Sequence, residues 1–118
     1  MSEHDLQVTV FDWVERNKNA LPELANYFAI PNGGHRWKSV AVKMKKEGQK
    51  AGILDTFLAI PTKKYHGLFI EHKWGKKGLT PEQKTWISKL ENYGYLCKVS
   101  RSFEETQETL LRYIDEVI

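Results

Sequence analysis

Apolar residues recur along the chain with two different periods, and the changes between these periods predict its helices and strands. From about residue 3 to residue 18 they lie three or four positions apart, which predicts an amphipathic helix. The apolar run at residues 27–30 ends in a Pro-Asn-Gly-Gly turn, which predicts a short strand. A lysine-rich stretch from residue 35 or 36 to about residue 47 is predicted as a second helix, because Gly48 stops it.

Two strands are predicted in the middle of the chain, at residues 53–60 and 67–73, and a helix follows them. That helix has a threonine cap at Thr80, a proline at its first position and a glutamine placed for a capping box. Gly94 ends it. Its buried stripe is expected at Trp86, Ile87 and Leu90.

The remaining segment predicts a short strand at residues 95–99, with Cys97 as a buried thiol, and a last helix that a second capping box opens at Ser102. The order of elements is therefore αβαββαβα. No internal repeat or long linker divides the sequence, so we expect residues 1–118 to form one domain. This order predicts an α/β fold with a mixed central sheet and flanking helices.

Composition excludes several classes of protein. The chain is 41% apolar and 28% charged, as in an ordinary globular domain. No apolar run approaches the roughly 20 residues of a membrane span, so we expect no membrane partner. A single cysteine cannot build a disulfide framework or a cysteine-rich zinc site. The first residues are polar and acidic, unlike a secretion signal, and we expect a cytoplasmic protein.

The net charge of +3 is unevenly distributed. Residues 35–77 hold eleven basic and three acidic residues, a net charge of +8. The segments before and after carry −3 and −2. A basic block of this kind indicates a polyanion such as a nucleic acid, because phosphate contacts dominate nucleic-acid affinity. A solvated lysine-rich face explains the same charge equally well.

Two carboxylates and a lysine interrupt the two central strands. Glu71 and Lys73 are two positions apart and point to the same side of their strand. If the strands form a hairpin, Asp55 falls opposite Glu71 or Lys73, and either register places all three on one face. Such a group suits a hard divalent cation such as Mg²⁺, which prefers one or two carboxylates together with water and phosphate. On spacing alone, an ordinary cross-strand ion pair is the favoured explanation.

The surrounding motifs change that balance. The pattern Asp-x15-Glu-x-Lys, followed by a capped helix with a glutamine, resembles the PD-(D/E)XK nuclease superfamily and, more narrowly, its virus-type replication-repair nuclease (VRR-NUC) domain. The resemblance covers nearly the whole chain in the right order and implies a restriction-endonuclease-like fold. The matching segments are EHDLQ (3–7), FAIPNGG (28–34), EGQKAGILD (47–55), YHGLFIEHK (65–73), LTPEQ (79–83) and YGY (93–95).

The resemblance implies a role for each matching residue. Asp55 and Glu71 would bind the metal, with the backbone carbonyl of His72 as a third contact. Lys73 would be the catalytic lysine. Gln83 matches the glutamine that lies at the active site in this family, and Glu3 matches an acidic residue that the first helix contributes to the metal site in many superfamily members.

The sequence departs from the family at Leu54, where a proline usually precedes the aspartate. That proline contributes no side-chain chemistry, so the predicted activity is unchanged. Five lysines of the basic block are expected to contact the nucleic-acid backbone. They are Lys43, Lys46, Lys50, Lys76 and Lys77.

The function that the resemblance implies is hydrolysis of DNA phosphodiester bonds with Mg²⁺ or Mn²⁺. Members that consist of this domain alone resemble virus-type enzymes, which act as homodimers on branched DNA, including Holliday junctions, and a phage protein of this kind would act in the host cytoplasm. Flap, splayed-arm or non-specific duplex cutting remain open, since they use the same catalytic residues. A non-catalytic DNA-binding module is the remaining alternative, and the intact set of Asp55, Glu71, Lys73 and Gln83 favours the enzyme.

Overall fold

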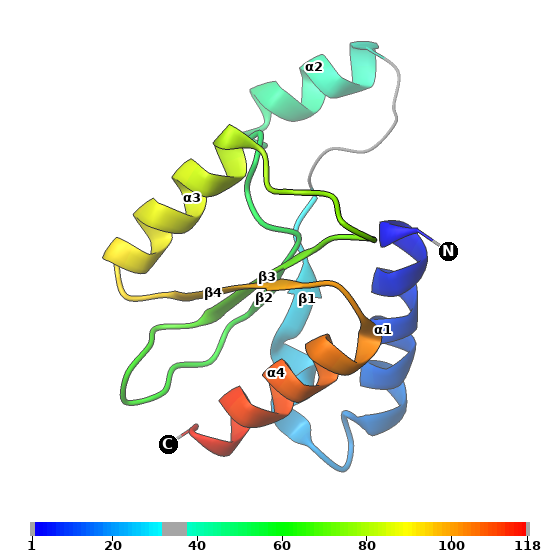
Figure 1. Cartoon of the computed structure of the whole chain (residues 1–118), viewed down its shortest axis with the longest axis vertical. Helices are drawn as coiled ribbons and strands as arrows, with labels where there is room; N and C mark the ends of the chain where they lie inside the picture. The colour runs from blue at the N-terminus through cyan, green and yellow to red at the C-terminus, as the bar shows by residue number, and fades with distance from the viewer. Residues whose placement is uncertain (1, 32–37, 118) are drawn as a thin grey trace.

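A computed structural model of the chain describes residues 2–31 and 38–117. Its order of helices and strands is the predicted αβαββαβα, with a short 3-10 helix, η1, added before the first strand (Figure 1). The elements are α1 (Glu3–Asn17), η1 (Pro22–Asn26), β1 (Tyr27–Ala29), α2 (Lys38–Lys46), β2 (Thr56–Leu58), β3 (Leu68–His72), α3 (Pro81–Asn92), β4 (Leu96–Ser100) and α4 (Phe103–Asp115). The predicted turn at residues 32–34 and the start of the second predicted helix lie outside the described residues.

The four strands form one mixed sheet in the order β1-β2-β3-β4. β1 pairs with β2 and β2 with β3 in antiparallel fashion, whereas β3 and β4 are parallel. The antiparallel register places Thr56 opposite Ile70, and the parallel register places His72 beside Ser100. The predicted α/β fold with a mixed central sheet and flanking helices is therefore confirmed.

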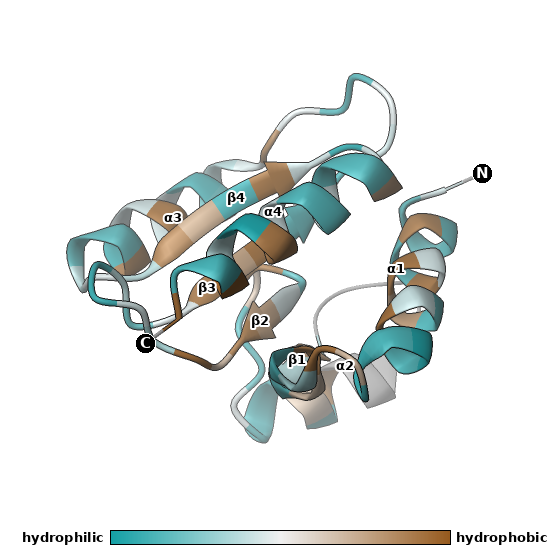
Figure 2. Ribbon diagram, turned by 90° about the horizontal axis from the view of Figure 1, so that it is seen from below, coloured by the Kyte–Doolittle hydropathy of each residue, from teal (hydrophilic) through white to brown (hydrophobic). Residues whose placement is uncertain are grey.

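The hydrophobic core lies between one face of the sheet and the helices α1 and α4. Leu6, Val10 and Val14 form the inward stripe of α1, at the spacing that the sequence predicts. Leu110 and Ile114 of α4 meet them from the other side, and the strand residues Leu58, Leu68 and Ile70 complete the core. In the view of Figure 2, β4 lies between α4, which is on the side of the core, and α3, which is on the opposite side.

The helix α3 lies on the opposite face of the sheet and packs mainly against β4, and its expected buried stripe is wrong in degree. Trp86, Ile87 and Leu90 are half-buried, and no residue of α3 is fully buried. The helical period identifies the inward side of a helix, but burial depth depends on what packs against that side. Cys97 beneath it is likewise half-buried instead of fully buried. The helix α2 stands apart from the sheet (Figure 1).

Neither predicted central strand extends as far as the sequence suggests. β2 begins one residue after Asp55, and at this point the Asp55 side chain accepts a hydrogen bond from the His72 amide, at 2.8 Å. The described part of the chain contains no helix that is long and apolar enough to cross a membrane.

Candidate active site

A cavity of about 340 Å³ opens where β2 begins and β3 ends, on the side of the sheet away from the main core. The N-terminus of α3, the start of α1 and the loop before Asp55 surround it. Most of its charged and amide side chains are residues that the sequence singled out. These are Glu3, Asp55, Glu71, Lys73, Lys77 and Gln83.

The strand register brings the two central carboxylates together. Thr56 pairs with Ile70, so the next residues outward, Asp55 and Glu71, lie opposite each other, and the charge of Asp55 raises the pKa of Glu71. Asp55 is held from both sides, because its carbonyl accepts from the Ile30 amide at 2.8 Å and its side chain accepts from the His72 amide. The predicted convergence on one face is therefore present.

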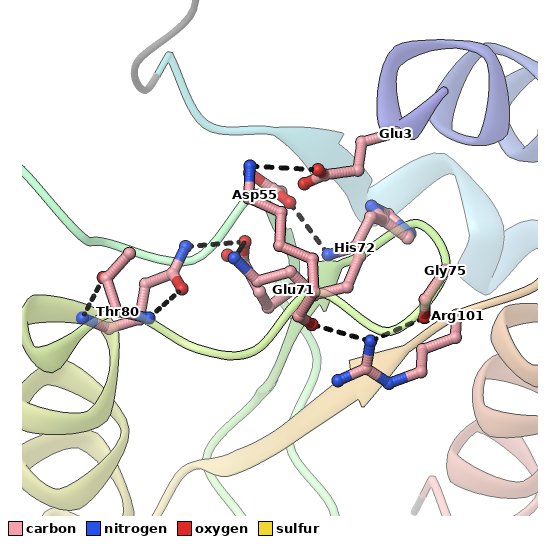
Figure 3. A network of polar contacts seen from close by, with 10 residues as sticks. Glu3, Asp55, Glu71, His72, Gly75, Thr80 and Arg101 are labelled. Carbon is pink, nitrogen blue, oxygen red and sulfur yellow. Dashed lines mark hydrogen bonds and ion pairs between the residues drawn. The ribbon is translucent and has the colours of Figure 1, made fainter. Parts of the chain in front are cut away.

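Lys73 and Gln83 both contact the same oxygen of Glu71. The amine of Lys73 lies 3.8 Å from Glu71 Oε2, and each side chain is only 3% exposed. Gln83 donates a hydrogen bond from Nε2 to Glu71 Oε2 at 2.8 Å (Figure 3). These contacts leave Glu71 Oε1 buried and without a hydrogen-bond partner in the described part of the chain.

The capping box of α3 orients Gln83 toward the site. Thr80 Oγ1 accepts from the Gln83 amide at 3.1 Å, and Gln83 Oε1 accepts from the Thr80 amide at 2.9 Å. Because the side-chain oxygen is engaged by the cap, the side-chain NH₂ is directed at Glu71 (Figure 3). The sequence predicts this capping box as a helix signal, and in the structure the same residues also position a carboxylate.

The loop before Asp55 approaches the start of α3 closely. Gly52 has φ +80°, and a Cβ placed on it would lie 2.5 Å from Glu82 Cβ, so glycine is needed for both conformation and space. The neighbouring Ala51 carbonyl accepts from Trp86 Nε1 at 3.1 Å. These two contacts fix the position of α3, and therefore of Gln83, relative to Asp55. Neither contact was predicted from the sequence, although the glycine three residues before Asp55 indicated a close approach of the backbone.

The electrostatics of the pair favour a bound cation. Burial and the nearby charge of Asp55 raise the pKa of Glu71 to about 8, against the opposing effect of Lys73. Burial also raises the pKa of Asp55, although its hydrogen bond from the His72 amide acts the other way. A buried carboxylate oxygen without a donor is costly, and a cation between the two carboxylates would satisfy it. The donor set therefore fits a hard divalent metal ion.

The metal contact that is predicted from α1 lies at the edge of the site. Glu3, the first residue of α1, lines the cavity, but its Oε2 is paired with Lys77 Nζ at 3.5 Å. Among the described residues, no three His, Cys, Asp or Glu side chains are close enough together to hold a metal ion. The site is therefore built on two carboxylates, with Glu3 at its edge.

The side chain of His72 points into the core, whereas its backbone faces the site. Its imidazole is fully buried toward the core, and burial lowers its pKa to about 4, so it is neutral near pH 7. Its amide faces Asp55, and in an extended strand the N–H and C=O of one residue point the same way. The backbone of His72 is therefore available to the site, whereas its side chain is not.

The five lysines expected to contact nucleic acid are all exposed, but they are not gathered in one place. Lys43 and Lys46 lie on α2, and Lys50 lies in the loop that follows it. Lys76 and Lys77 lie in the loop between β3 and α3, and Lys77 is the member of the five that lines the cavity.

The structure therefore combines a mixed sheet, a half-buried and a buried carboxylate at strand ends, a lysine two residues after the second carboxylate and a glutamine from the following helix. These features are those of an α/β domain with a candidate active site of the nuclease type. No protein-family model matches the chain, and no curated protein matches it. A solved structure described as a "VRR_NUC domain protein" is similar with a TM-score of 0.80 and 31% sequence identity, covering 98% of this chain and 89% of that chain. The chain therefore belongs to the VRR-NUC family and has its nuclease fold.

Proposed function

We propose that this protein is a divalent-metal-dependent endonuclease that hydrolyses phosphodiester bonds of DNA, with branched DNA as its substrate and a homodimer as its active form. The observation that carries the proposal is the pair of half-buried Asp55 and buried Glu71 inside one cavity, in which Lys73 and Gln83 contact Glu71. A structural ion pair would not need a second carboxylate against the first, because that arrangement destabilises the fold.

Asp55 and Glu71, with the backbone carbonyl of His72, are the groups that would hold Mg²⁺ or Mn²⁺, and Glu3 would complete the site from α1. A cation bound there would polarise the scissile phosphodiester and lower the pKa of a water molecule. Glu71 Oε1, buried and without a partner among the described residues, is the oxygen best placed to bind it.

The chain's own residues supply orientation and charge. Lys73 is fixed beside Glu71, and its amine is placed to donate a hydrogen bond to the attacking water or to a phosphate oxygen that gains negative charge. Gln83 holds Glu71 in one rotamer through its hydrogen bond to Oε2. A carboxylate held in this way loses less side-chain entropy when it binds a cation.

The exposed lysines and the single site per chain support a DNA substrate and a dimer. Lys77 at the cavity, with Lys50 and α2 farther out, would contact backbone phosphates on either side of the cleaved bond. One catalytic centre cuts one strand at a time, so symmetric cleavage of a four-way junction needs two chains related by a twofold axis.

The test is cleavage of a labelled four-way junction, beside flap, splayed-arm, duplex and single-stranded controls, in Mg²⁺, Mn²⁺ or chelator. The variants are Asp55→Asn and Lys73→Met, with Lys63→Met as the matched control. Lys63 is exposed in the connection between β2 and β3, at the end of the strands away from the cavity.

Paired, metal-dependent cuts near the crossover are expected from wild type and Lys63→Met, and from neither site variant. Preferential cutting of another substrate would retain the nuclease and remove the junction preference. Absence of cleavage in either metal, with DNA binding intact, would contradict the enzyme.

A further inference from the structure

The loop of residues 74–79 joins the end of β3 directly to the cap of α3, and both of its ends are fixed at the candidate active site. Lys73 is buried beside Glu71 at one end, and Thr80 orients Gln83 at the other. Between them, residues 74–78 are exposed. The loop contains two lysines and no acidic residue, so it presents positive charge beside the carboxylate pair.

Arg101, at the end of β4, holds the shape of this loop. Its Nη1 donates to the carbonyl of Gly75 at 3.0 Å and to the carbonyl of Lys77 at 2.7 Å (Figure 3). Hydrogen bonds from a guanidinium are charge-assisted, and one group here fixes two carbonyls that lie two residues apart. Gly75, with φ +64°, provides the left-handed turn that lets the loop fold back toward it.

The backbone of Arg101 is itself well anchored. Its amide donates to Glu105 Oε1 at 2.9 Å, and the preceding Ser100 carbonyl accepts from the Lys73 amide at 2.9 Å. The parallel pairing of β3 and β4 therefore places Arg101 next to the loop that follows β3. Arg101 forms no ion pair with another described residue, which leaves its charge committed to the loop carbonyls.

Fixing the loop backbone places the Lys77 side chain at the cavity. Its amine lies 3.5 Å from Glu3 Oε2, and its side chain is 65% exposed, so the amine is accessible to solvent and to ligands. An exposed ion pair of this kind is weak, so a phosphodiester group can displace Glu3 from it. The lysine is thus held at its backbone and free to exchange one anionic partner for another.

We propose that residues 74–79 form a preorganised phosphate-binding loop for the DNA strand next to the cleaved bond, and that Arg101 is its positioning residue. The proposal rests on the proposed function, because the phosphate it would bind belongs to the nuclease substrate. Lys77 contacts the phosphate, and Arg101 acts on DNA only by holding the two carbonyls that set the position of Lys77.

The test compares DNA affinity at several salt concentrations for Arg101→Met, Lys77→Met and the double variant. A labelled four-way junction is the probe, with Ca²⁺ in place of the catalytic metal. Arg112→Met is the matched control, because Arg112 is an exposed arginine of α4 that pairs with Glu108 on its own helix. Melting temperatures report any general loss of fold, and exposed Lys77 is replaced without removing core contacts.

Each single variant is expected to weaken binding several-fold and to reduce the salt slope by about one, the effect of one lost phosphate contact. The double variant should lose less than the product of the two single effects, because both changes remove the same contact. Arg101→Lys should restore part of the affinity, since a lysine can donate to one of the carbonyls. Arg112→Met should match wild type.

Fully multiplicative losses, combined with complete rescue by Arg101→Lys, would make Arg101 itself a phosphate contact and overturn the positioning role. Unchanged affinity and slope in Arg101→Met would also overturn it. Both outcomes require that wild type binds DNA. If wild type neither binds nor cuts any DNA, the proposed function itself fails, so the two failures are distinguishable.

Discussion

Replacing Glu71 with glutamine should stabilise the metal-free protein at high pH while removing the proposed metal site. Burial and Asp55 raise the pKa of Glu71 from 4.5 to about 8. A group whose pKa is higher in the folded state stabilises that state fully below its unfolded pKa and loses the effect as pH rises through the folded pKa. The wild type should therefore lose stability between about pH 4.5 and pH 8, as Glu71 is forced to ionise beside Asp55.

The size of this loss follows from the shift. About 3.5 pKa units at 1.36 kcal/mol each give roughly 5 kcal/mol, an upper bound because Asp55 and Glu71 titrate together. Glutamine imitates the protonated carboxyl: its NH₂ can donate to Asp55, and its oxygen can accept from Gln83. At roughly 4 °C per kcal/mol for a domain of this size, the variant should melt above wild type at pH 9, by up to about 20 °C.

The assay is thermal unfolding in chelator from pH 5 to pH 9, followed by circular dichroism. Glu82→Gln is the control, because Glu82 is an exposed carboxylate that lines the same cavity. Taking the difference between variant and wild type cancels the titrating groups that do not interact with residue 71. A difference between Glu71→Gln and wild type that stays constant across this range, or that favours wild type as pH rises, would refute the reasoning.

Three further outcomes are expected. His72 is buried and has a pKa of about 4, so its protonation should lower the free energy of unfolding by up to about 3 kcal/mol as pH falls from 6.5 to 4. Urea unfolding of His72→Leu should not show this decrease. An equal decrease in the variant would contradict the prediction. Gly52→Ala should lower the melting temperature more than Gly48→Ala, because both glycines have positive φ but only the first meets α3; equal losses would exclude the clash. Thr80→Ala and Ser102→Ala should each lose a helix cap, worth about 1 kcal/mol, but only the first should also reduce DNA cleavage; equal cleavage by both would contradict the second role of the capping box.

The parts of the fold and site that depend on local periodicity could be predicted from the sequence. Strand side chains alternate, so Glu71 and Lys73 had to share a face, and a hairpin register with Asp55 opposite either of them brought Asp55 to the same face. The N-caps Thr80 and Ser102 could be predicted in the same way. The predicted capping box is complete at Thr80 but wrong at Ser102, because the Glu105 side chain accepts from the Arg101 amide instead of the Ser102 amide.

Contacts between distant elements could not be predicted in this way. The hydrogen bond from Gln83 to Glu71, and the two from Arg101 to the loop after β3, depend on how α3 and β4 are placed against the sheet. The same reason explains why the stripe of α3 that was expected to be buried is only half-buried, since this helix packs mainly against β4. A helical period reports direction, whereas depth is set by the neighbours.

The central claim is that Asp55 and Glu71 form a divalent-metal site, and calorimetric titration of Mn²⁺ into the protein at pH 8 tests it most directly. Wild type and Glu82→Gln should show the same saturable binding, which Asp55→Asn and Glu71→Gln should lose while keeping their fold. Equal binding by all four proteins would contradict the account, because the metal would then bind elsewhere, and neither Asp55 nor Glu71 would take part in metal binding.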